Sequence, residues 1–375
     1  MPRRVAIITG TRAEFGLLRP VMRAVQAAPG LELLVIASGA HLISPADTFH
    51  EVKAGFPIAG IVPMQLAGKT GRAEDAQALA RGVARFAREF ERLKPDWVVV
   101  LGDRIEPFAA TAAAAIAGYA IAHIHGGDRA EGVADESMRH AITKLAHLHL
   151  PATQQSAERI IRMGEPPERV HVVGSPAMDD LAAWTSSGNT DRLADLAEPN
   201  PTVLFLMHPI GRPDEVEEAA AAQVLEGLKG ERVLALHPNF DPGREGILRA
   251  IESAGVASMP HLPREALVKL LAKLARDGGA LVGNSSSGLI ECAAIRVPVV
   301  DIGPRQGGRE RCANVVHIDS ERAENVREGV RKARALDLAR LSNPYGDGRT
   351  GERIAAILGD VDPRLPGFLR KRNTY

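Results

Sequence analysis

Residues 95–124, PDWVVVLGDRIEPFAATAAAAIAGYAIAHI, contain an apolar run, a turn of Gly and polar residues, an Ala-rich stretch of helical period and a second apolar run. Residues 278–302, GGALVGNSSSGLIECAAIRVPVVDI, repeat this order. Near-continuous apolar strands that alternate with helices are typical of parallel sheets covered on both faces. The two repeats therefore predict an α/β protein with two doubly wound domains, whose ligand binds at the carboxyl ends of the strands, in a central cleft that both domains face.

Short β-branched runs elsewhere extend both sheets. Predicted strands include Val5–Thr9, Leu33–Ser38, Val170–Val173, Val203–Met207 and Arg232–Leu236, with segments of helical period between them. Residues 180–202 are polar, rich in turn residues and end in Pro-Asn-Pro, which indicates a domain boundary. We expect a first domain over residues 1–180, a second over 200–350, and a final segment over 351–375 that contains a helix and a Pro-punctuated tail.

The composition limits the class of partner. The 375 residues include 46 Lys plus Arg and 46 Asp plus Glu, so no net charge favours nucleic acid or an anionic membrane. The apolar run near the N-terminus is too short for a signal peptide, and residues 109–124 are too interrupted for a membrane span. Cys292 and Cys312 form no CxxC pair, which fits a reducing compartment. We predict a cytoplasmic protein without nucleic-acid or membrane partners.

Three polar turns follow predicted strands and are candidates for binding an anion. Ser285, Ser286, Ser287 and Gly288 lie in GNSSSG, where backbone N–H groups and hydroxyls at a helix N-terminus suit a phosphate. The alternative is a helix cap, for which one Ser is enough. Two further strand ends carry arginines that suit a diphosphate: Arg12 in ITGTRAEFG and Arg305 in RQGGRER. For RQGGRER the alternative is a solvated loop.

Carboxylates follow two consecutive strands of the first domain. Asp103 comes directly after one strand, and Asp128, Glu131 and Asp135 follow the next. Because the carboxyl ends of neighbouring parallel strands lie side by side, we expect these groups to converge. Clustered carboxylates raise one another's pKa, which suits a general base and a general acid near neutral pH. The alternative for Asp103 is a cap on the following helix.

The histidines of residues 122–150 do not have the spacing of a metal site. His123 and His125 alternate along a strand and point to opposite faces. His140, His147 and His149 are expected on a helix, where His140 and His147 are two turns apart. The sequence contains no HExxH motif and no set of Cys ligands. We therefore predict no metal.

Two His-Pro pairs follow strands of the second domain. His208 stands in LFLMHPIG and His237 in LALHPNFDPG. A histidine at a strand end is well placed to bind a phosphate or to transfer a proton. A single such histidine is usually structural, but two equivalent ones favour a functional role.

The chain closely resembles the hydrolysing UDP-N-acetylglucosamine 2-epimerases of the sialic-acid pathway. The matching motifs, in order, are GTRAEFGLL, SGAHL, VLGDRIEPFAA, HIHGGDRAEGVADESMRHAITKLAHLH, VVGSPAMD, HPNFDPG, GNSSSGLIE and GPRQGGRERCANV. The resemblance implies a GT-B architecture of two Rossmann-like domains, with a C-terminal helix that packs back on the first. It also implies anti elimination of UDP to a glycal, hydration to N-acetylmannosamine, no nicotinamide or metal cofactor, and a homodimer or homotetramer.

The resemblance also assigns roles to individual residues. Asp103, Asp135 and His208 match catalytic positions of the family. The binding positions that match are Arg12 and Arg104 at the diphosphate or sugar, His41 in the sugar pocket, Ser285, Ser286 and Ser287 at the phosphates, Glu291 at the ribose hydroxyls, and Asn239 and Arg305 in the nucleotide site.

The chain departs from some relatives at His125, where they carry a Glu. Asp128 or Glu131 is then expected to supply that acid. Alternative readings are the same reaction on another nucleotide sugar, such as a UDP-linked diacetamido-trideoxy sugar or GDP-N-acetylglucosamine, a GT-B glycosyltransferase, and an inactive nucleotide-sugar-binding regulator.

Overall fold

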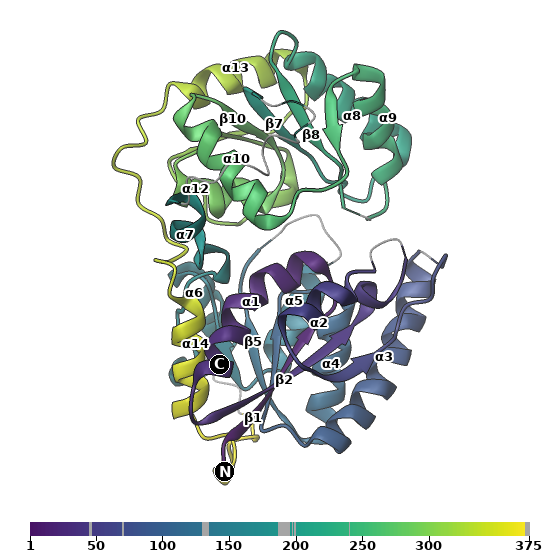
Figure 1. Cartoon of the computed structure of the whole chain (residues 1–375), viewed down its shortest axis with the longest axis vertical. Coiled ribbons are helices and arrows are strands. Elements are labelled where there is room, and N and C mark those ends of the chain that lie inside the picture. The colour runs from purple at the N-terminus through teal and green to yellow at the C-terminus, as the bar shows by residue number, and fades with distance from the viewer. Residues whose placement is uncertain are drawn as a thin grey trace. The chain divides into compact units, whose positions relative to one another are not determined.

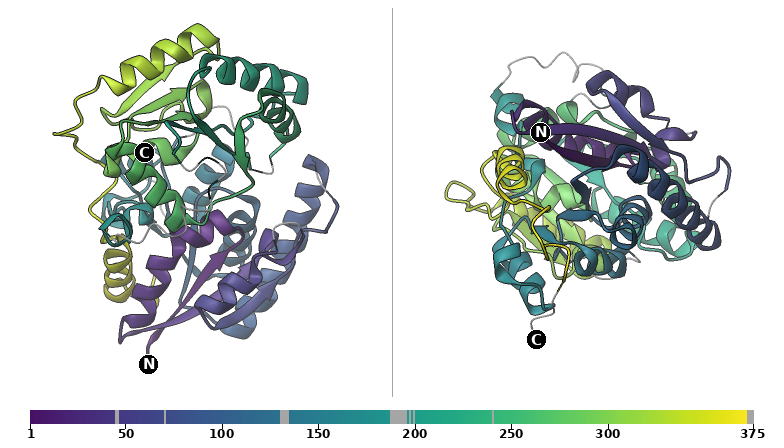
Figure 2. Two further views of the ribbon diagram at one scale, coloured as in Figure 1. Left: turned by 45° about the horizontal axis from the view of Figure 1, so that its top comes forward. Right: turned by 90° about the horizontal axis from the view of Figure 1, so that it is seen from below.

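The computed structural model describes residues 1–44, 47–69, 71–129, 135–186, 196, 198, 200–239 and 241–371. The chain divides into two compact units (Figure 1). The first comprises residues 1–128, 134–179 and 345–375, and the second comprises residues 129–133 and 180–344. Each unit contains one parallel six-stranded sheet with helices on both faces, as the further views in Figure 2 show.

The sheet of the first unit has the strand order β3-β2-β1-β4-β5-β6. The strands are β1 (Arg3–Thr9), β2 (Leu31–Ser38), β3 (Ile58–Val62), β4 (Trp97–Leu101), β5 (Ala120–Ile124) and β6 (Leu148–Leu150). The helices are α1 (Arg12–Ala27), α2 (Phe49–Gly55), α3 (Arg72–Leu93), α4 (Ile105–Ala117), α5 (Asp135–Leu145), α6 (Gln154–Arg162) and α14 (Thr350–Asp360). The order reverses between β1 and β4, so ligands are expected where the carboxyl ends of these strands diverge.

Strand β1 shows why this sheet is buried on both faces. Val5 and Ile7 belong to the core cluster that contains α1 and α14, whereas Ala6 and Ile8 belong to the cluster that contains α3 and α4. All four side chains have no exposed surface. The alternation of strand side chains therefore fills two helix layers with one uninterrupted apolar run.

The Ala-rich segment that precedes β5 is a packed helix. Ala109 and Ala110 of α4 are fully buried, and α4 packs closely against α3. A Cβ atom on Gly82 of α3 would lie 2.9 Å from the Cβ of Ala109, so small residues on both helices permit this approach. Among the described residues, no helix is both long enough and apolar enough to cross a membrane.

The second unit repeats this plan. Its sheet order is β12-β11-β10-β7-β8-β9, with strands β7 (Val203–Leu206), β8 (Val233–Leu236), β9 (Ala257–Met259), β10 (Ala280–Gly283), β11 (Val299–Ile302) and β12 (Val315–Ile318). The helices are α7 (Leu181–Ser186), α8 (Asp214–Gly227), α9 (Arg244–Ala254), α10 (Arg264–Arg276), α11 (Ser286–Leu289), α12 (Glu291–Ile295) and α13 (Ala323–Arg334). Gly283 ends β10 at φ +150°, and a Cβ there would lie 2.0 Å from the carbonyl oxygen of Leu206. Only glycine lets β10 and β7 end this close together.

The C-terminal segment belongs to the first unit. The Asp179 carboxylate accepts hydrogen bonds from the backbone N–H groups of Thr350 (3.0 Å) and Gly351 (2.7 Å), which caps the N-terminus of α14. Farther on, Arg364 binds Asp96 through two nitrogens, at 2.6 and 2.7 Å. Together these contacts fix the last helix and the tail on the sheet of the first unit.

Two details of the expected secondary structure were wrong. Residues 170–173 form no strand, because only Val170 bridges to the sheet, opposite His149. His147 and His149 are not on a helix, since α5 ends at Leu145; His147 follows its end and His149 lies in strand β6. The His149 ring is fully buried and pairs with Glu165, Nε2 to Oε2 at 3.0 Å. A buried hydrogen-bonding partner thus lets a histidine occupy an apolar strand position.

Candidate active site

Asp103 lies at the carboxyl end of β4 and is paired with an arginine from a distant helix. A left-handed Gly102 (φ +76°) turns the chain after β4, and its N–H donates to the carbonyl oxygen of Ile124 at the end of β5 (3.0 Å). The Arg139 side chain of α5 forms an ion pair with Asp103 Oδ2. Arg139 also donates from Nη1 to the carbonyl oxygen of Asp128 (3.1 Å). One guanidinium therefore ties together the ends of two neighbouring strands.

Arg139 was not among the residues singled out from the sequence. It is only 4% exposed, so a full positive charge is held inside the unit by Asp103 and the Asp128 carbonyl. Burying such a charge is costly unless it is paired, which makes Asp103 and Arg139 energetically interdependent. The sequence feature that could have predicted Arg139 is its place one turn into the helix after the acid-rich loop, because the acids of that loop need a positive partner.

Asp128 is buried and makes hydrogen bonds through both oxygens. Its Oδ2 accepts from His125 Nδ1 (2.8 Å), and its Oδ1 accepts from the hydroxyl of Ser156 (2.9 Å). His125 Nε2 lies 3.0 Å from the hydroxyl of Ser175. His125 has φ +63°, a left-handed conformation that a histidine adopts only where its surroundings compensate the strain.

These contacts bind Asp128 directly to His125, the position at which the resemblance implies a Glu in some relatives. Asp128 is 3% exposed and His125 is 7% exposed. The catalytic role of Asp128 stays a prediction, and it requires its carboxylate to exchange these bonds for substrate. Glu131 lies outside the described residues. Asp135 is the first residue of α5, which is all that the structure describes of it.

His41 is a structural histidine in this conformation. Its ring is fully buried, with Nε2 2.9 Å from the Thr9 hydroxyl and Nδ1 2.6 Å from the Thr48 hydroxyl. It also meets the Phe15 ring edge to face, at 6.0 Å between centroids. Burial lowers the pKa of His41 to about 4, so the ring is neutral. Contact with a sugar therefore stays a prediction for this residue.

The turn after β1 is closed by its own side chains. The Thr11 hydroxyl accepts from the N–H of Glu14 (3.3 Å), and Glu14 Oε2 accepts from the N–H of Gly10 (2.7 Å). This arrangement resembles a capping box and uses N–H groups that an anion would need. Arg12 pairs with Glu51 at 3.1 Å. The TxxE spacing of residues 11–14 was the signal for this cap.

Two buried carboxyl groups lie next to this turn. Glu14 is 6% exposed and Glu106 is fully buried. Glu106 accepts from Gln65 Nε2 (2.7 Å), and its other oxygen lies 3.8 Å from Nε of Arg104, the N-cap residue of α4. Gly10 makes room for it, because a Cβ there would lie 2.6 Å from the Glu106 side chain. Burial, with a smaller contribution from Glu106, raises the pKa of Glu14 to about 8, so Glu14 is protonated at neutral pH.

We expect Glu14→Gln to remove a pH dependence of stability. The folded state holds the Glu14 proton between the ordinary pKa of 4.5 and about 8, so this contribution to stability is complete below pH 4.5 and is lost as pH rises through 8. At about 1.4 kcal/mol per pKa unit, the loss is roughly 5 kcal/mol. Urea denaturation at pH 5 and pH 9 measures the free energy of unfolding at each pH. Between the two, this free energy should decrease less in Glu14→Gln than in the wild type. Equal decreases in the two proteins would contradict a protonated Glu14.

The second unit gathers polar groups around His208 at the end of β7. The His208 N–H donates to Asn284 Oδ1 (2.7 Å), and Asn284 Nδ2 donates to the His208 carbonyl oxygen (2.8 Å). The N–H of Asn239 donates to His208 Nδ1 (3.2 Å). Arg305 donates from Nη1 to the Asn284 carbonyl oxygen (3.1 Å). Residues from three other loops of the same unit therefore meet at His208: Asn239 binds its imidazole, Asn284 binds its backbone, and Arg305 binds Asn284.

The serine turn combines a cap with open hydroxyls. Ser285 is the N-cap residue of α11 and accepts from the N–H of Ser287 (3.4 Å). Ser285 is buried, whereas Ser286 and Ser287 are partly exposed. A Cβ on Gly288 would lie 3.0 Å from Val299 Cγ1, so this glycine serves close packing of helix on strand. Ser286 and Ser287 are the hydroxyls still placed to meet a phosphate.

Two other predicted binding residues of the second unit contact other partners. Glu291 accepts from Arg264 Nη1 (2.8 Å), and the Arg264 guanidinium lies 6.0 Å from the centroid of the Trp184 ring. His237 donates its backbone N–H to Met259 (3.0 Å), and burial lowers the pKa of its side chain. Within the described ranges, no three His, Cys, Asp or Glu side chains form a group that could hold a metal ion.

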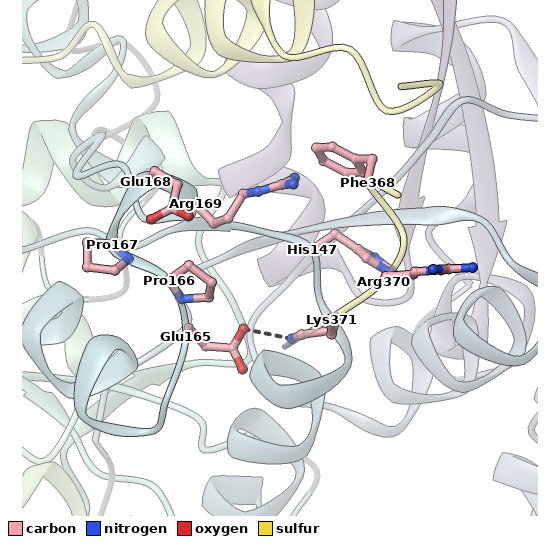
Figure 3. A pocket seen from close by; sticks show the side chains of 9 residues that line it. All are labelled: His147, Glu165, Pro166, Pro167, Glu168, Arg169, Phe368, Arg370 and Lys371. Atoms are coloured by element: carbon pink, nitrogen blue, oxygen red, sulfur yellow. Dashed lines mark ion pairs between the residues drawn. The ribbon is translucent and has the colours of Figure 1, made fainter. Parts of the chain in front are cut away.

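A cavity of about 280 Å³ in the first unit lies at the tail (Figure 3). None of the predicted catalytic residues lines it. Lys371 reaches Glu165 (2.8 Å) and donates to the carbonyl oxygen of Lys144 (2.6 Å) near the end of α5. Phe368 packs under the Arg169 guanidinium at 3.8 Å. These contacts anchor the tail, and we assign the cavity no part in the reaction.

The chain is similar to known proteins along its whole length. The family model described as UDP-N-acetylglucosamine 2-epimerase matches residues 23–359. A UDP-N,N'-diacetylbacillosamine 2-epimerase (hydrolyzing) of Legionella pneumophila is 34% identical over 385 aligned positions, covering 100% of both chains. A UDP-N-acetylglucosamine 2-epimerase of Neisseria meningitidis is 30% identical, covering 96% of both chains.

Solved structures confirm the predicted fold of two Rossmann-like domains. The structure of UDP-N-acetylglucosamine 2-epimerase from Neisseria meningitidis bound to UDP-GlcNAc has a TM-score of 0.79 at 18% identity, over 95% of this chain and 99% of that one. The Methanocaldococcus jannaschii enzyme in complex with UDP-GlcNAc and UDP has a TM-score of 0.78 at 17% identity, with the same coverage. The GT-B-like class predicted from the sequence is therefore confirmed.

Proposed function

Because the chain belongs to the UDP-N-acetylglucosamine 2-epimerase family, we propose that it is a hydrolysing 2-epimerase that releases UDP from a UDP-linked 2-acetamido sugar. The observation that carries this proposal is Asp103, held by the buried Arg139 at the end of β4. Directly beside it, at the end of β5, stands the His125–Asp128 pair. An acid–base reaction at a sugar carbon needs such oriented groups.

In the proposed elimination, the Asp103 carboxylate removes the proton from C2 of the sugar. The C2–H electron pair forms a C1=C2 double bond, and the C1–O bond breaks to release UDP. Water then adds its hydroxyl to C1, while a proton returns to C2 from the opposite face. The products are UDP and a free sugar inverted at C2. The C2 proton is weakly acidic, so its removal depends on a base fixed close to it.

The groups of the second unit suit the leaving diphosphate. Ser286 and Ser287 present hydroxyls, Arg305 presents a guanidinium, and His208 presents an imidazole. Preorganised donors of this kind stabilise negative charge that develops in the transition state. We assign the nucleotide to the second unit and the acid–base chemistry to the first.

Two sugars are candidates for the substrate. UDP-N-acetylglucosamine is the substrate predicted from the sequence, and the name of the Neisseria meningitidis relative contains it. The Legionella pneumophila relative, at 34% identity over the whole chain, is named for UDP-N,N'-diacetylbacillosamine. The two sugars share the acetamido group at C2 and differ at C4 and C6, so both permit the same elimination.

A donor panel tests this proposal. We expect UDP release from one or both of these UDP sugars without an added acceptor, and a preference of at least tenfold in kcat/KM for one of them. A glycosyltransferase would instead need an acceptor for turnover at a comparable rate. Absence of UDP release from every 2-acetamido sugar, or a strict need for an acceptor, would contradict the proposed function.

A further inference from the structure

The side chain of Asn284 forms two hydrogen bonds with the backbone of one other residue. Its Oδ1 accepts from the His208 N–H (2.7 Å), and its Nδ2 donates to the His208 carbonyl oxygen (2.8 Å). Asn284 is 3% exposed and follows β10, which pairs with β7, the strand that precedes His208. A planar group with a donor and an acceptor side by side is needed here, and among side chains of this length only asparagine provides it.

The backbone of Asn284 also positions the neighbouring cation. Its carbonyl oxygen accepts from Arg305 Nη1 (3.1 Å) and from Gln306 Nε2 (2.8 Å). The Gln306 side chain is buried, so this second bond is shielded from water. Asn284 therefore sets the positions of both His208 and Arg305, two of the groups assigned to the leaving diphosphate.

The hydrogen bonds around His208 also determine its tautomer. A backbone N–H can only donate, so the bond from Asn239 N to His208 Nδ1 (3.2 Å) requires an unprotonated Nδ1. The proton of the neutral ring is then on Nε2. Loss of hydration, with a smaller contribution from the positive Arg305, lowers the pKa of His208 to about 3. The Asn239 side chain in turn donates to the carboxylate of Asp241 (2.5 Å).

We propose that Asn284 is a positioning residue that holds His208 as a neutral imidazole with its proton on Nε2, aimed to donate a hydrogen bond to the departing diphosphate. That the acceptor is a diphosphate rests on the proposed function. The tautomer of His208 follows from its hydrogen bonds alone and is independent of that function. A ring in this state cannot take the C2 proton, because Nδ1 is occupied and Nε2 already carries hydrogen. The base must then come from the carboxylates of the first unit.

The test is an NMR measurement of the imidazole nitrogens in the full-length protein labelled with ¹⁵N-histidine. The His208 signals are assigned by their loss in His208→Gln. We expect Nδ1 at the position of an unprotonated nitrogen and Nε2 at that of a protonated one, without titration from pH 5 to pH 8. In Asn284→Ala and Asn284→Asp, we expect mixed tautomers and a pKa closer to the ordinary 6.5.

Steady-state kinetics with the preferred UDP sugar provide the second measurement. We expect kcat to fall about 100-fold in Asn284→Ala, as for other small misplacements of reacting groups, with KM changed less than fivefold. The matched control is Asn314→Ala in the same unit. Asn314 is also fully buried and donates to the Val297 carbonyl oxygen (3.0 Å). It makes no contact with His208 that would move the histidine signals, so we expect kcat within twofold of the wild type.

Two results would overturn the proposal: a wild-type His208 that is charged or protonated on Nδ1, or an Asn284→Ala variant with unchanged histidine signals and unchanged kcat. An equal loss of kcat in Asn314→Ala would also overturn it, because the effect would then be one of general stability. If no UDP sugar is turned over, the proposed function fails, while the spectra of the free protein still decide the tautomer.

Discussion

Asp103→Asn is expected to lower kcat for UDP release about 1,000-fold, within the range for loss of a general base. The carboxamide keeps the shape of the side chain but cannot accept the C2 proton. UDP affinity should stay within threefold of the wild type, because the nucleotide contacts are assigned to residues of the second unit. Initial rates of UDP release and calorimetric titration with UDP measure the two quantities separately.

The control for this substitution is Asp96→Asn. Asp96 precedes the other end of β4 and binds Arg364 through two nitrogens. It therefore offers the same change of a carboxylate that is paired with an arginine, far along the same strand. We expect its kcat within twofold of the wild type. An Asp103→Asn enzyme with wild-type rates would remove Asp103 from the reaction.

Arg139→Met is expected to destabilise the first unit by about 3 kcal/mol, the range for breaking a buried ion pair. Asp103 and the Asp128 carbonyl oxygen would both lose their bonds to the guanidinium. Activity should fall with stability, because Asp103 would no longer be oriented. Arg139→Lys should restore neither stability nor activity, since one ammonium cannot reproduce the two contacts of the guanidinium.

The two tryptophans allow this measurement on one unit. Trp97 lies in β4 of the first unit, and Trp184 lies in α7 of the second. In a Trp184→Phe background, fluorescence during urea denaturation reports on the first unit. The double variant Arg139→Met/Asp103→Asn should lose less free energy of unfolding than the two single variants lose together, because it leaves no unpaired buried charge. Simple additivity would contradict the ion pair.

The fold could be predicted because its central strands carry strong local signals. The strands that end at Leu101 and Gly283 are uninterrupted apolar runs, and the strand that ends at Ile124 is interrupted only by His123; all three are followed by glycine-containing or polar turns. The strands that were missed, β3, β6, β9 and β12, are three to five residues long and lie at or next to the sheet edges. So short a run has no clear period, and its pairing is decided by tertiary contacts.

The site could be predicted only in part, for a different reason. Asp103 follows a strand directly, so the rule for parallel sheets places it. Arg139 comes from a helix beyond the acid-rich loop, and its direction depends on how α5 packs on the sheet. His41 has the same sequence context as a binding residue, but two hydroxyls and Phe15 enclose it. Burial of this kind follows from packing and is not visible in a motif.

The position of His125 shows how one substitution changes the chemistry of a motif. A Glu there would present a carboxylate directly, whereas His125 presents an imidazole with Asp128 bound at Nδ1. The carboxylate is then that of Asp128, which is buried and bound to both His125 and Ser156. Which group returns the proton to C2 is consequently a separate question from which group removes it.

The most direct measurement is proton NMR of the sugar product formed in heavy water from UDP-N-acetylglucosamine and, in a parallel reaction, from UDP-N,N'-diacetylbacillosamine. Elimination followed by hydration predicts free UDP and a free sugar that is inverted at C2 and carries deuterium there. A released sugar that retains its original hydrogen at C2 would show that the C2 proton is never removed, and would contradict the central claim.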